Sequence, residues 1–513
     1  MMAPPTSGNY SFTVTLADEE ATRRLMVDIA EAIKPGDVIT LSGDLGAGKT
    51  TFARALIRHL AGDPTIEVPS PTFTLMQAYE LPRFTLVHAD FYRLGGPAEL
   101  AELGFEDIAP STVTLIEWPD RAASVLPDAR LDIALTLSPL EGPTFRHARV
   151  TGHGAFAARV ERMAAIRMFL SRSGFGGASR QYMQGDASTR AYERLNYGGA
   201  SYILMNSPQR PDGPPVREGK PYSVIAHLAD NVTPFVAMAQ ALRARGFSAP
   251  AIFAADRAAG LLILEDLGSE LVVAGEPPAP IEARYEVAAD LLAALHGLPM
   301  PDVLPVEGDV TYALPHYDLD ALLIEAELLI DWYLPRLGVK LAGDKRDAYV
   351  ELWHAALKPA LAASPVWVLR DYHSPNLLWL PGREGVARIG LLDFQDAVMG
   401  PAAYDLASLA QDARVDVPEM MEIALLSRYT RARLAEEPGF DAPAFAQLYA
   451  TMAAQRASKI LGIFARLDKR DGKPQYLRHM PRVWAYLQRS LAHPALAPLT
   501  SWYRVNVPSL KSI

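Results

Sequence analysis

The sequence contains one glycine-rich run whose residue types and spacing suit phosphate binding, Gly43–Thr51. Its first eight residues fit the pattern G-x-x-x-x-G-K-[ST], and they lie between an apolar run and an amphipathic one. Glycines allow successive backbone N–H groups to face a phosphate, and the start of a helix favours negative charge. We expect Lys49 to contact the β- and γ-phosphates of ATP and Thr50 to bind Mg²⁺. The expected nucleotide-binding residues of this run are Gly43, Asp44, Gly46, Ala47, Gly48, Lys49, Thr50 and Thr51.

Two carboxylates follow predicted strands downstream of this run. Asp90 follows the run Phe84–Ala89, and Glu117 ends the run that begins at Val113. Phosphoryl chemistry at such a loop needs an acidic partner for magnesium and a group that positions water. We therefore expect Asp90 and Glu117 to serve the metal and the hydrolysis, although each alone could be an ordinary carboxylate at the end of a strand.

A second set of polar residues lies in the C-terminal half. Asp371 and Asn376 have the D-x-x-x-x-N spacing of a kinase catalytic loop, without the histidine that usually stands two residues before the aspartate. An apolar run ends at Asp393, where kinases place a magnesium ligand. We expect Asp371 to accept the proton of the attacking hydroxyl, and Asn376 and Asp393 to hold Mg²⁺. The alternative is a turn capped by an Asx side chain and a simple strand end.

Further nucleotide contacts are expected upstream of this loop. A glycine-containing turn precedes a predicted strand that ends at Met205, where ordinary kinases have a lysine. Arg190 and Lys220 are the two candidates for supplying the missing charge. A later apolar run resembles the strand and hinge that face adenine. The expected nucleotide-binding residues here are Gly185, Ser188, Arg190 and Glu265.

The elements that must position these residues differ between the two halves. Residues 12–137 alternate short β-rich runs with helical stretches, which indicates an α/β P-loop NTPase domain, and a turn-rich cluster follows it. We place the boundary near residue 155. The predicted strands are Asp37–Ser42, Phe84–Ala89, Val113–Trp118 and Leu131–Leu137, and the predicted helices are Glu19–Ala32 and Thr50–Leu60.

The second half, residues 156–513, is predicted to be an α+β kinase-like domain with two lobes. Glycine- and β-rich segments over about 160–268 indicate a small lobe, and long stretches of apolar periodicity over about 269–513 indicate a mainly helical large lobe. The predicted helices are Val160–Ser173, Ala283–His296, Leu319–Leu334, Arg346–Ala363 and Ala444–Leu467.

The overall composition limits the classes of function. The 513 residues carry a formal net charge of −10, so there is no global basic field to hold a nucleic acid. We expect no direct DNA binding. There is no cysteine, no basic segment followed by an apolar run at the start, and no long uncharged apolar stretch. These features predict a cytoplasmic protein without membrane spans.

The motifs of the first half resemble a known family. Gly43–Thr51, Ser70–Phe73, His88–Leu94 and Ile116–Pro119, in this order, are similar to TsaE, the ATPase of bacterial tRNA threonylcarbamoyladenosine synthesis. The resemblance implies that Ser70–Phe73 form a switch-like loop and that Trp118 lies close to the nucleotide. It also implies docking on a threonylcarbamoyl-transferase core of TsaB- and TsaD-like proteins, which would hold the tRNA, so that this chain meets tRNA only through those partners.

The second half resembles the aminoglycoside phosphotransferase and choline kinase superfamily. Within it, Gly185–Leu195, Ser201–Pro208, Leu314–Asp318 and Asp331–Pro335 are similar to AmgK, the anomeric kinase family of N-acetylmuramic acid and N-acetylglucosamine. That family also lacks the strand lysine, so Met205 is compatible with activity. The resemblance implies ATP-dependent phosphorylation of the anomeric hydroxyl of an amino sugar during cell-wall recycling, with Asp371 as the base.

Two other functions remain open at this point. The kinase could act on another hydroxyl, such as that of an aminoglycoside, choline or a homoserine-like molecule. Alternatively, a pseudokinase scaffold could be fused to a nucleotide-dependent assembly factor, although a scaffold would not need Asp371, Asn376 and Asp393 together.

Overall fold

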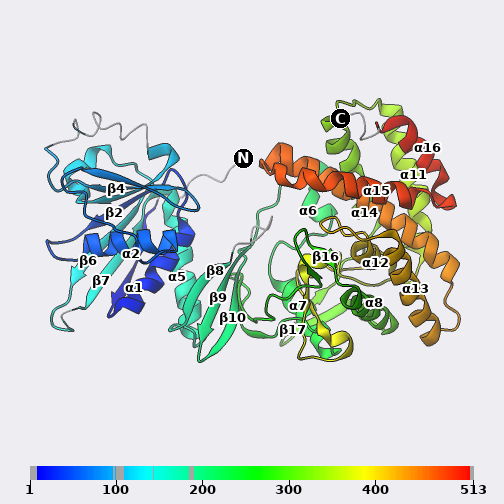
Figure 1. Cartoon of the computed structure of the whole chain (residues 1–513), viewed down its shortest axis with the longest axis horizontal. Helices are drawn as coiled ribbons and strands as arrows, with labels where there is room; N and C mark the ends of the chain where they lie inside the picture. Colours follow the sequence, from blue (N-terminus) through cyan, green and yellow to red (C-terminus); the bar gives the residue numbers. More distant parts are fainter. Residues whose placement is uncertain (1–7, 96–98, 100–108, 143, 184–189, 509–513) are drawn as a thin grey trace. The chain divides into compact units, whose positions relative to one another are not determined.

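The computed structural model describes residues 8–95, 99, 109–142, 144–183 and 190–508. The chain forms two compact units, residues 1–205 and 206–513. Figure 1 shows their elements coloured along the sequence. The first unit therefore extends past the boundary that we propose near residue 155 and includes the first strands of the second half.

The first unit is built on a seven-stranded sheet in the order β1-β7-β6-β2-β5-β4-β3. Its centre is parallel, because β2 pairs in parallel with β5 and β6, and β5 with β4. The outer strands β1, β7 and β3 are antiparallel to their neighbours. The bounds are β1 Tyr10–Leu16, β2 Val38–Ser42, β3 Met76–Glu80, β4 Thr85–Asp90, β5 Val113–Glu117, β6 Leu131–Leu137 and β7 Arg146–Gly152. The α/β prediction and its four strands are confirmed.

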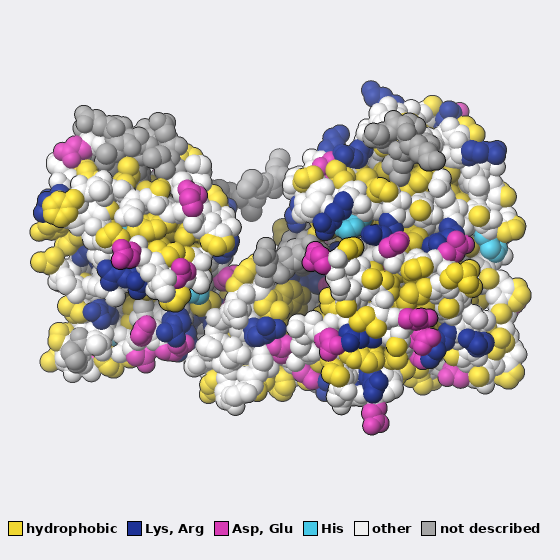
Figure 2. All heavy atoms as spheres, viewed as in Figure 1, with side chains coloured by type: hydrophobic (Ala, Val, Ile, Leu, Met, Phe, Trp, Pro, Cys, Tyr) yellow, Lys and Arg dark blue, Asp and Glu magenta, His cyan; other side chains and the backbone are white. Residues whose placement is uncertain are grey.

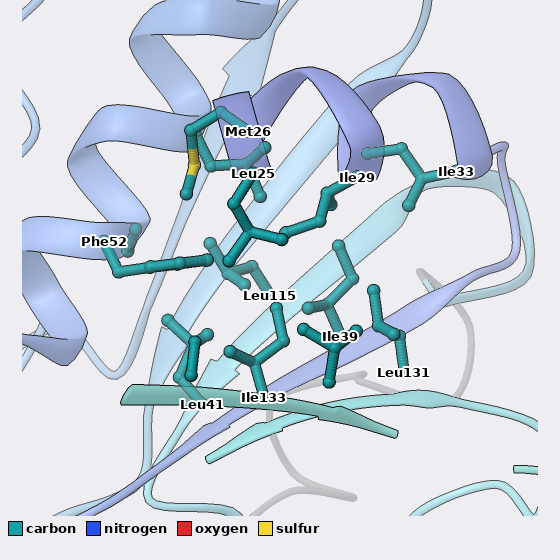
Figure 3. Close-up of a cluster of buried hydrophobic side chains, with 14 of the residues drawn as sticks. Leu25, Met26, Ile29, Ile33, Ile39, Leu41, Phe52, Leu115, Leu131 and Ile133 are labelled. Carbon is teal, nitrogen blue, oxygen red and sulfur yellow. The ribbon is translucent and has the colours of Figure 1, made fainter. Parts of the chain in front are cut away.

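Helices α1 (Glu19–Ala32) and α2 (Lys49–Ala61) also match the prediction within a residue. The side chain of Asp18 caps α1 by accepting a hydrogen bond of 2.7 Å from the backbone N–H of Ala21. Both helices bury one apolar face against the sheet, and this burial is the main stabilisation of the domain. Figure 3 shows Leu25, Met26 and Ile29 of α1, Ile33 directly after α1, and Phe52 of α2 packed over the sheet residues Ile39, Leu41, Leu115, Leu131 and Ile133.

Helix α5 (Ala157–Arg172) and the neighbouring strands β8 (Ser179–Met183), β9 (Ala191–Tyr197) and β10 (Ala200–Asn206) complete this part of the chain, and β8 pairs with β9 in antiparallel fashion. A buried ionic cluster joins them to α1. Arg167 donates to Asp28 at 2.6 Å, and Arg180 also pairs with Asp28. Arg180 in addition makes a bidentate pair with Glu193, at 2.6 and 2.9 Å. The side chains of Asp28 and Arg180 are only 1% and 3% exposed. Each charge therefore needs the opposite charge of the other to offset the free-energy cost of its burial.

The second unit is mainly helical, as predicted. Its short strands include the hairpin of β13 (Ile252–Asp256) and β14 (Leu261–Glu265), and the pairs β19 (Val366–Val368) with β22 (Val398–Gly400) and β20 (Leu377–Trp379) with β21 (Ile389–Leu391). Its longer helices are α7 Thr233–Ala244, α8 Glu282–Gly297, α9 Leu319–Leu328, α11 Gly343–Ala362, α12 Ala403–Ala410, α13 Glu419–Glu436, α14 Ala442–Asp471, α15 Met480–Leu491 and α16 Ala497–Asn506.

One predicted helix is interrupted. The stretch Leu319–Leu334 is α9 followed by a π-helical turn, Leu329–Tyr333, and the short helix Leu334–Arg336. Helix α14 crosses here at very short range, because a Cβ atom added to Gly462 would lie 2.3 Å from the backbone carbon of Leu328. Only glycine permits this approach between two helix backbones. The close crossing anchors α14, which carries residues of the second site.

Charged side chains of both signs are interspersed on the face shown in Figure 2. Within the residues that the structure describes, no helix is both long enough and apolar enough to cross a bilayer.

Candidate active sites

The first site is a cavity of about 440 Å³ at the carboxyl end of the parallel strands. The loop between β2 and α2 forms one wall of it. Of the predicted residues of the first half, the structure places Gly46, Gly48, Lys49, Thr50, Thr51, Asp90, Glu117 and Trp118 in the lining. The glycine-rich run, the two strand-end carboxylates and the tryptophan are thus brought together.

Glycine is required at the start of this loop. Gly43 has φ +135°, and a Cβ atom there would lie 2.3 Å from the carbonyl oxygen of Leu135 on β6. Gly46 also has a positive φ, +83°, but a Cβ atom at Gly46 would meet nothing within 4 Å.

These two glycines provide a matched pair of substitutions. We expect Gly43→Ala to destabilise the first unit by at least ~2 kcal/mol and to abolish nucleotide binding there, because both the backbone strain and the clash must be relieved. Gly46→Ala should cost only the ~1 kcal/mol of backbone strain. Thermal unfolding and binding of a fluorescent ATP analogue measure the two effects. Equal losses of stability and of nucleotide binding in the two variants would contradict the role given to Gly43.

Lys49 lies inside the loop that should hold the phosphates. Its Nζ donates to the carbonyl oxygens of Gly43 at 2.7 Å and Asp44 at 3.0 Å, and it lies 3.6 Å from the ring centroid of Trp118. Burial lowers the pKa of Lys49, and the nearby carboxylates of Glu117, Asp90 and Asp44 oppose this effect. An ammonium group held by carbonyl dipoles and an aromatic face is poised to move onto a phosphate.

Thr50 and Glu117 are hydrogen-bonded to each other. The hydroxyl of Thr50 donates to Oε2 of Glu117 at 2.8 Å, and Nε2 of His88 lies 3.0 Å from Oε1 of the same carboxylate. His88 and Glu117 are almost fully buried. A threonine hydroxyl beside a carboxylate suits Mg²⁺, which keeps several waters and phosphate oxygens and takes few protein ligands. The donor set present therefore fits a nucleotide with magnesium.

Asp90 stands beside Glu117, because the two residues are register partners on the parallel strands β4 and β5. Oδ2 of Asp90 accepts from the hydroxyls of Ser70 at 2.7 Å and Thr72 at 2.8 Å. The segment expected to behave as a switch is thereby tied to the carboxylate expected to serve hydrolysis.

Arg146 is a residue of this site that lies outside every predicted motif. Arg146 at the start of β7 lines the cavity and donates from Nε to the carbonyl oxygen of Ala47 at 2.9 Å. It lies far from every motif along the chain, so only the pairing of β7 with β6 brings it to the loop.

The second site is centred on the segment after β19. Arg370 adopts the left-handed backbone conformation, φ +67°, and its buried guanidinium pairs with Glu325 and donates to the carbonyl oxygen of Ala226 at 2.8 Å. Asp405 accepts from the backbone N–H groups of Leu369 at 2.6 Å and Arg370 at 2.9 Å. Left-handed backbone at a residue other than glycine persists only where its surroundings fix it, and here they fix the position of Asp371.

Asn376 and Asp393 complete this site. Nδ2 of Asn376 donates to the backbone carbonyl of Asp371 at 3.0 Å, which leaves Oδ1 without a donor among the described residues. Oδ1 of Asp393 accepts from Gln395 at 3.1 Å. An amide oxygen and a carboxylate oxygen are the hard ligands that Mg²⁺ prefers, so these side chains fit the expected metal.

The carboxylate of Asp371 is partly exposed, and its pKa lies above the ordinary aspartate value, because of desolvation and the neighbouring charge of Asp393. A raised pKa makes the carboxylate a better proton acceptor once it is ionised. Burial holds the pKa of His373 well below its usual range, so His373 is neutral near pH 7.

The remaining nucleotide-site predictions have different outcomes. Gly185 and Ser188 lie outside the described residues. Arg190 is half-buried just before β9. Met205 is buried in the strand predicted for it. Glu265 ends β14 as predicted, and its carboxylate is bound by Arg243 at 3.1 Å and Arg383 at 2.7 Å, so a contact with adenine would come from its backbone.

Comparison with known proteins identifies both halves. Residues 16–142 match the family described as threonylcarbamoyl adenosine biosynthesis protein TsaE, and residues 181–449 match the phosphotransferase enzyme family. A tRNA threonylcarbamoyladenosine biosynthesis protein TsaE of Rickettsia felis is 42% identical over 120 residues, which are 23% of this chain and 70% of the relative. The chain belongs to both families. The TsaE-type half and the phosphotransferase half are therefore both enzymes, and both families use ATP.

Two kinases extend the match of the second half. An N-acetylmuramate/N-acetylglucosamine kinase of Caulobacter vibrioides is 43% identical over 361 residues, which are 68% of this chain and 97% of the relative. The kinase of the same name from Pseudomonas aeruginosa is 36% identical over 320 residues, 61% of this chain and 84% of the relative. The phosphotransferase half thus covers nearly the whole length of the first of these enzymes.

Proposed function

We propose that the chain is a bifunctional enzyme. Its TsaE-type half hydrolyses ATP in support of tRNA threonylcarbamoyladenosine synthesis. Its phosphotransferase half transfers the γ-phosphoryl group of ATP to the anomeric hydroxyl of N-acetylmuramic acid and N-acetylglucosamine in cell-wall recycling. The match over 97% of a kinase of these two sugars, with Asp371, Asn376 and Asp393 all present, carries the kinase assignment.

The proposed kinase reaction gives a role to each of three residues. Asp371 accepts the proton of the anomeric hydroxyl as its oxygen attacks the γ-phosphorus, and ADP leaves with the bridging oxygen. Asn376 and Asp393 would hold Mg²⁺, which neutralises charge on the phosphate oxygens when it is bound. The fixed conformation of Arg370 keeps the base in place, so that little reorganisation is needed during the reaction.

In the first half, Mg²⁺ and the attacking water would be held by Thr50, Asp90 and Glu117. Lys49 would contact the β- and γ-phosphates. The hydrogen bond from Thr50 to Glu117 and those from Ser70 and Thr72 to Asp90 support these roles.

The proposed partners are the TsaB- and TsaD-like proteins of the threonylcarbamoyl-transferase core, which would hold the tRNA. Such a function, together with the absence of cysteine, supports a cytoplasmic location. We also keep the domain boundary near residue 155 as a proposal, supported by the gap between the two matched ranges.

Transfer of labelled phosphate from ATP to each sugar tests the kinase assignment. We expect a sugar phosphate that is hydrolysed by mild acid. Phosphate is lost easily from the anomeric carbon, because the ring oxygen stabilises the oxocarbenium ion that remains. Kanamycin and choline are the comparison acceptors. Product from these two and not from the amino sugars would overturn the assignment in favour of the alternative acceptors.

A further inference from the structure

A cavity of about 140 Å³ opens beside Asp371 in the second unit. It is smaller than the pockets of roughly 300–1,000 Å³ that enclose whole ligands, so it suits one substituent of a substrate. Four cationic side chains line it against two carboxylates. The cations are Arg370, Arg414, Arg456 and Lys459, and the carboxylates are Asp371 and Asp412.

Two of the four cations share one carboxylate. Arg370 pairs with Glu325, and Nζ of Lys459 lies 2.9 Å from the same carboxylate. Asp412 is occupied by hydrogen bonds from Ser374, at 2.6 and 2.8 Å, and from the backbone N–H of Arg414 at 2.8 Å. The carboxylates of Glu325 and Asp412 therefore already have partners and do not act as the counter-ion of another cation.

Arg456 is the unusual member of the set. It lies on α14 and is only 6% exposed. Its Nη1 donates to the carbonyl oxygen of Gln411 at 3.2 Å, and no carboxylate among the described residues lies within ion-pair distance of it. A buried guanidinium with four further N–H groups and no counter-ion is costly, and such a group is normally satisfied by an anion.

We propose that Arg456 binds the carboxylate of the lactyl ether of N-acetylmuramic acid. This inference rests on the proposed kinase function and assigns the residue that distinguishes its two sugars. N-acetylmuramic acid differs from N-acetylglucosamine only in this ether, which carries a carboxylate and stands on C3, two ring carbons from the anomeric carbon that Asp371 must serve. A planar guanidinium binds a carboxylate through two parallel hydrogen bonds, and the cavity beside the base is large enough for that group alone.

Comparison of the two sugars in one variant tests the proposal. For Arg456→Met we expect the KM for N-acetylmuramic acid to rise about 10- to 100-fold, because a buried charge-assisted hydrogen bond is lost, and the KM for N-acetylglucosamine to stay unchanged. Arg456→Lys keeps the charge and should recover part of the preference. Since Arg456 also acts on the pKa of Asp371, any effect on the base is common to both sugars and cancels in the ratio.

The matched control is Arg466→Met, on the same helix and outside the cavity, with its guanidinium 5.1 Å from the ring centroid of Tyr222. It should leave the ratio of the two KM values unchanged. Equal losses with both sugars, or a raised KM for ATP, would overturn the assignment of Arg456 and leave the kinase function standing. If the unmutated protein phosphorylated neither sugar, the proposed function and this inference would both fall.

Discussion

Asp371→Asn is expected to lower phosphoryl transfer to both amino sugars by about 10²- to 10⁴-fold, the contribution typical of a positioned general base. Asparagine has nearly the same shape, so the backbone hydrogen bonds of Asp405 to Leu369 and Arg370 should survive. The amide cannot take the proton of the anomeric hydroxyl at neutral pH. Measurement of kcat with each sugar at saturating ATP gives the size of the loss.

The control for this substitution is Asp290→Asn on α8. Asp290 forms a half-exposed pair with Arg428, at 2.6 and 2.8 Å, and lies outside the cavity beside Asp371. Its loss should cost at most ~1 kcal/mol of stability and no activity. A fall in kcat of the same size in both variants would mean that Asp371 acts through folding and not as the base.

Lys49→Ala should reduce the sugar-independent hydrolysis of ATP by about 10²- to 10³-fold, because it removes the only side-chain ammonium among the described residues that line the first site. The cation–π contact with Trp118 and the bonds to the loop carbonyls are lost at the same time, so binding of ATP at this site should also weaken. Release of phosphate without sugar, in the full-length chain carrying Asp371→Asn, isolates this activity from the kinase.

Lys34→Ala, at an exposed position after α1, is the matched control and should hydrolyse ATP at the unmutated rate. In the chain with Asp371 intact, Lys49→Ala should leave sugar phosphorylation unchanged. Hydrolysis that survived Lys49→Ala undiminished would refute the assignment of the phosphate-binding loop.

The first site was largely predictable from sequence, because its parts lie in short motifs with fixed local geometry. The pattern of Gly43–Thr50 predicts a phosphate-binding loop when a strand precedes it and a helix follows it, and Asp90 and Glu117 stand at the ends of strands that can be recognised by their apolar residues. Arg146 could not be found in this way, since it reaches the loop only through the pairing of β7 with β6. Its own neighbours in sequence carry no motif.

The second site shows the same division. The spacing of Asp371 and Asn376 predicted that these two residues act together, and in the structure Asn376 donates a hydrogen bond to the backbone carbonyl of Asp371. The cavity beside Asp371 was not predictable. Arg456 lies in the middle of a helix with apolar periodicity, and nothing in that pattern indicates that one of its arginines is buried. The π-helical turn after Leu328 was also missed, and it lies where Gly462 of α14, far away in sequence, approaches the backbone closely.

The ionic cluster around Asp28 determines where the chain can be cut. A fragment ending near residue 155 would keep Asp28 and lose both of its arginines, and the complementary fragment would keep Arg167, Arg180 and Glu193 without their aspartate. Removing one partner from a buried pair typically costs ~3–5 kcal/mol, a large part of the stability of a domain. A break after β10, near residue 205, spares the cluster but divides the kinase half. Separate expression of the two enzymes would therefore change at least one of them.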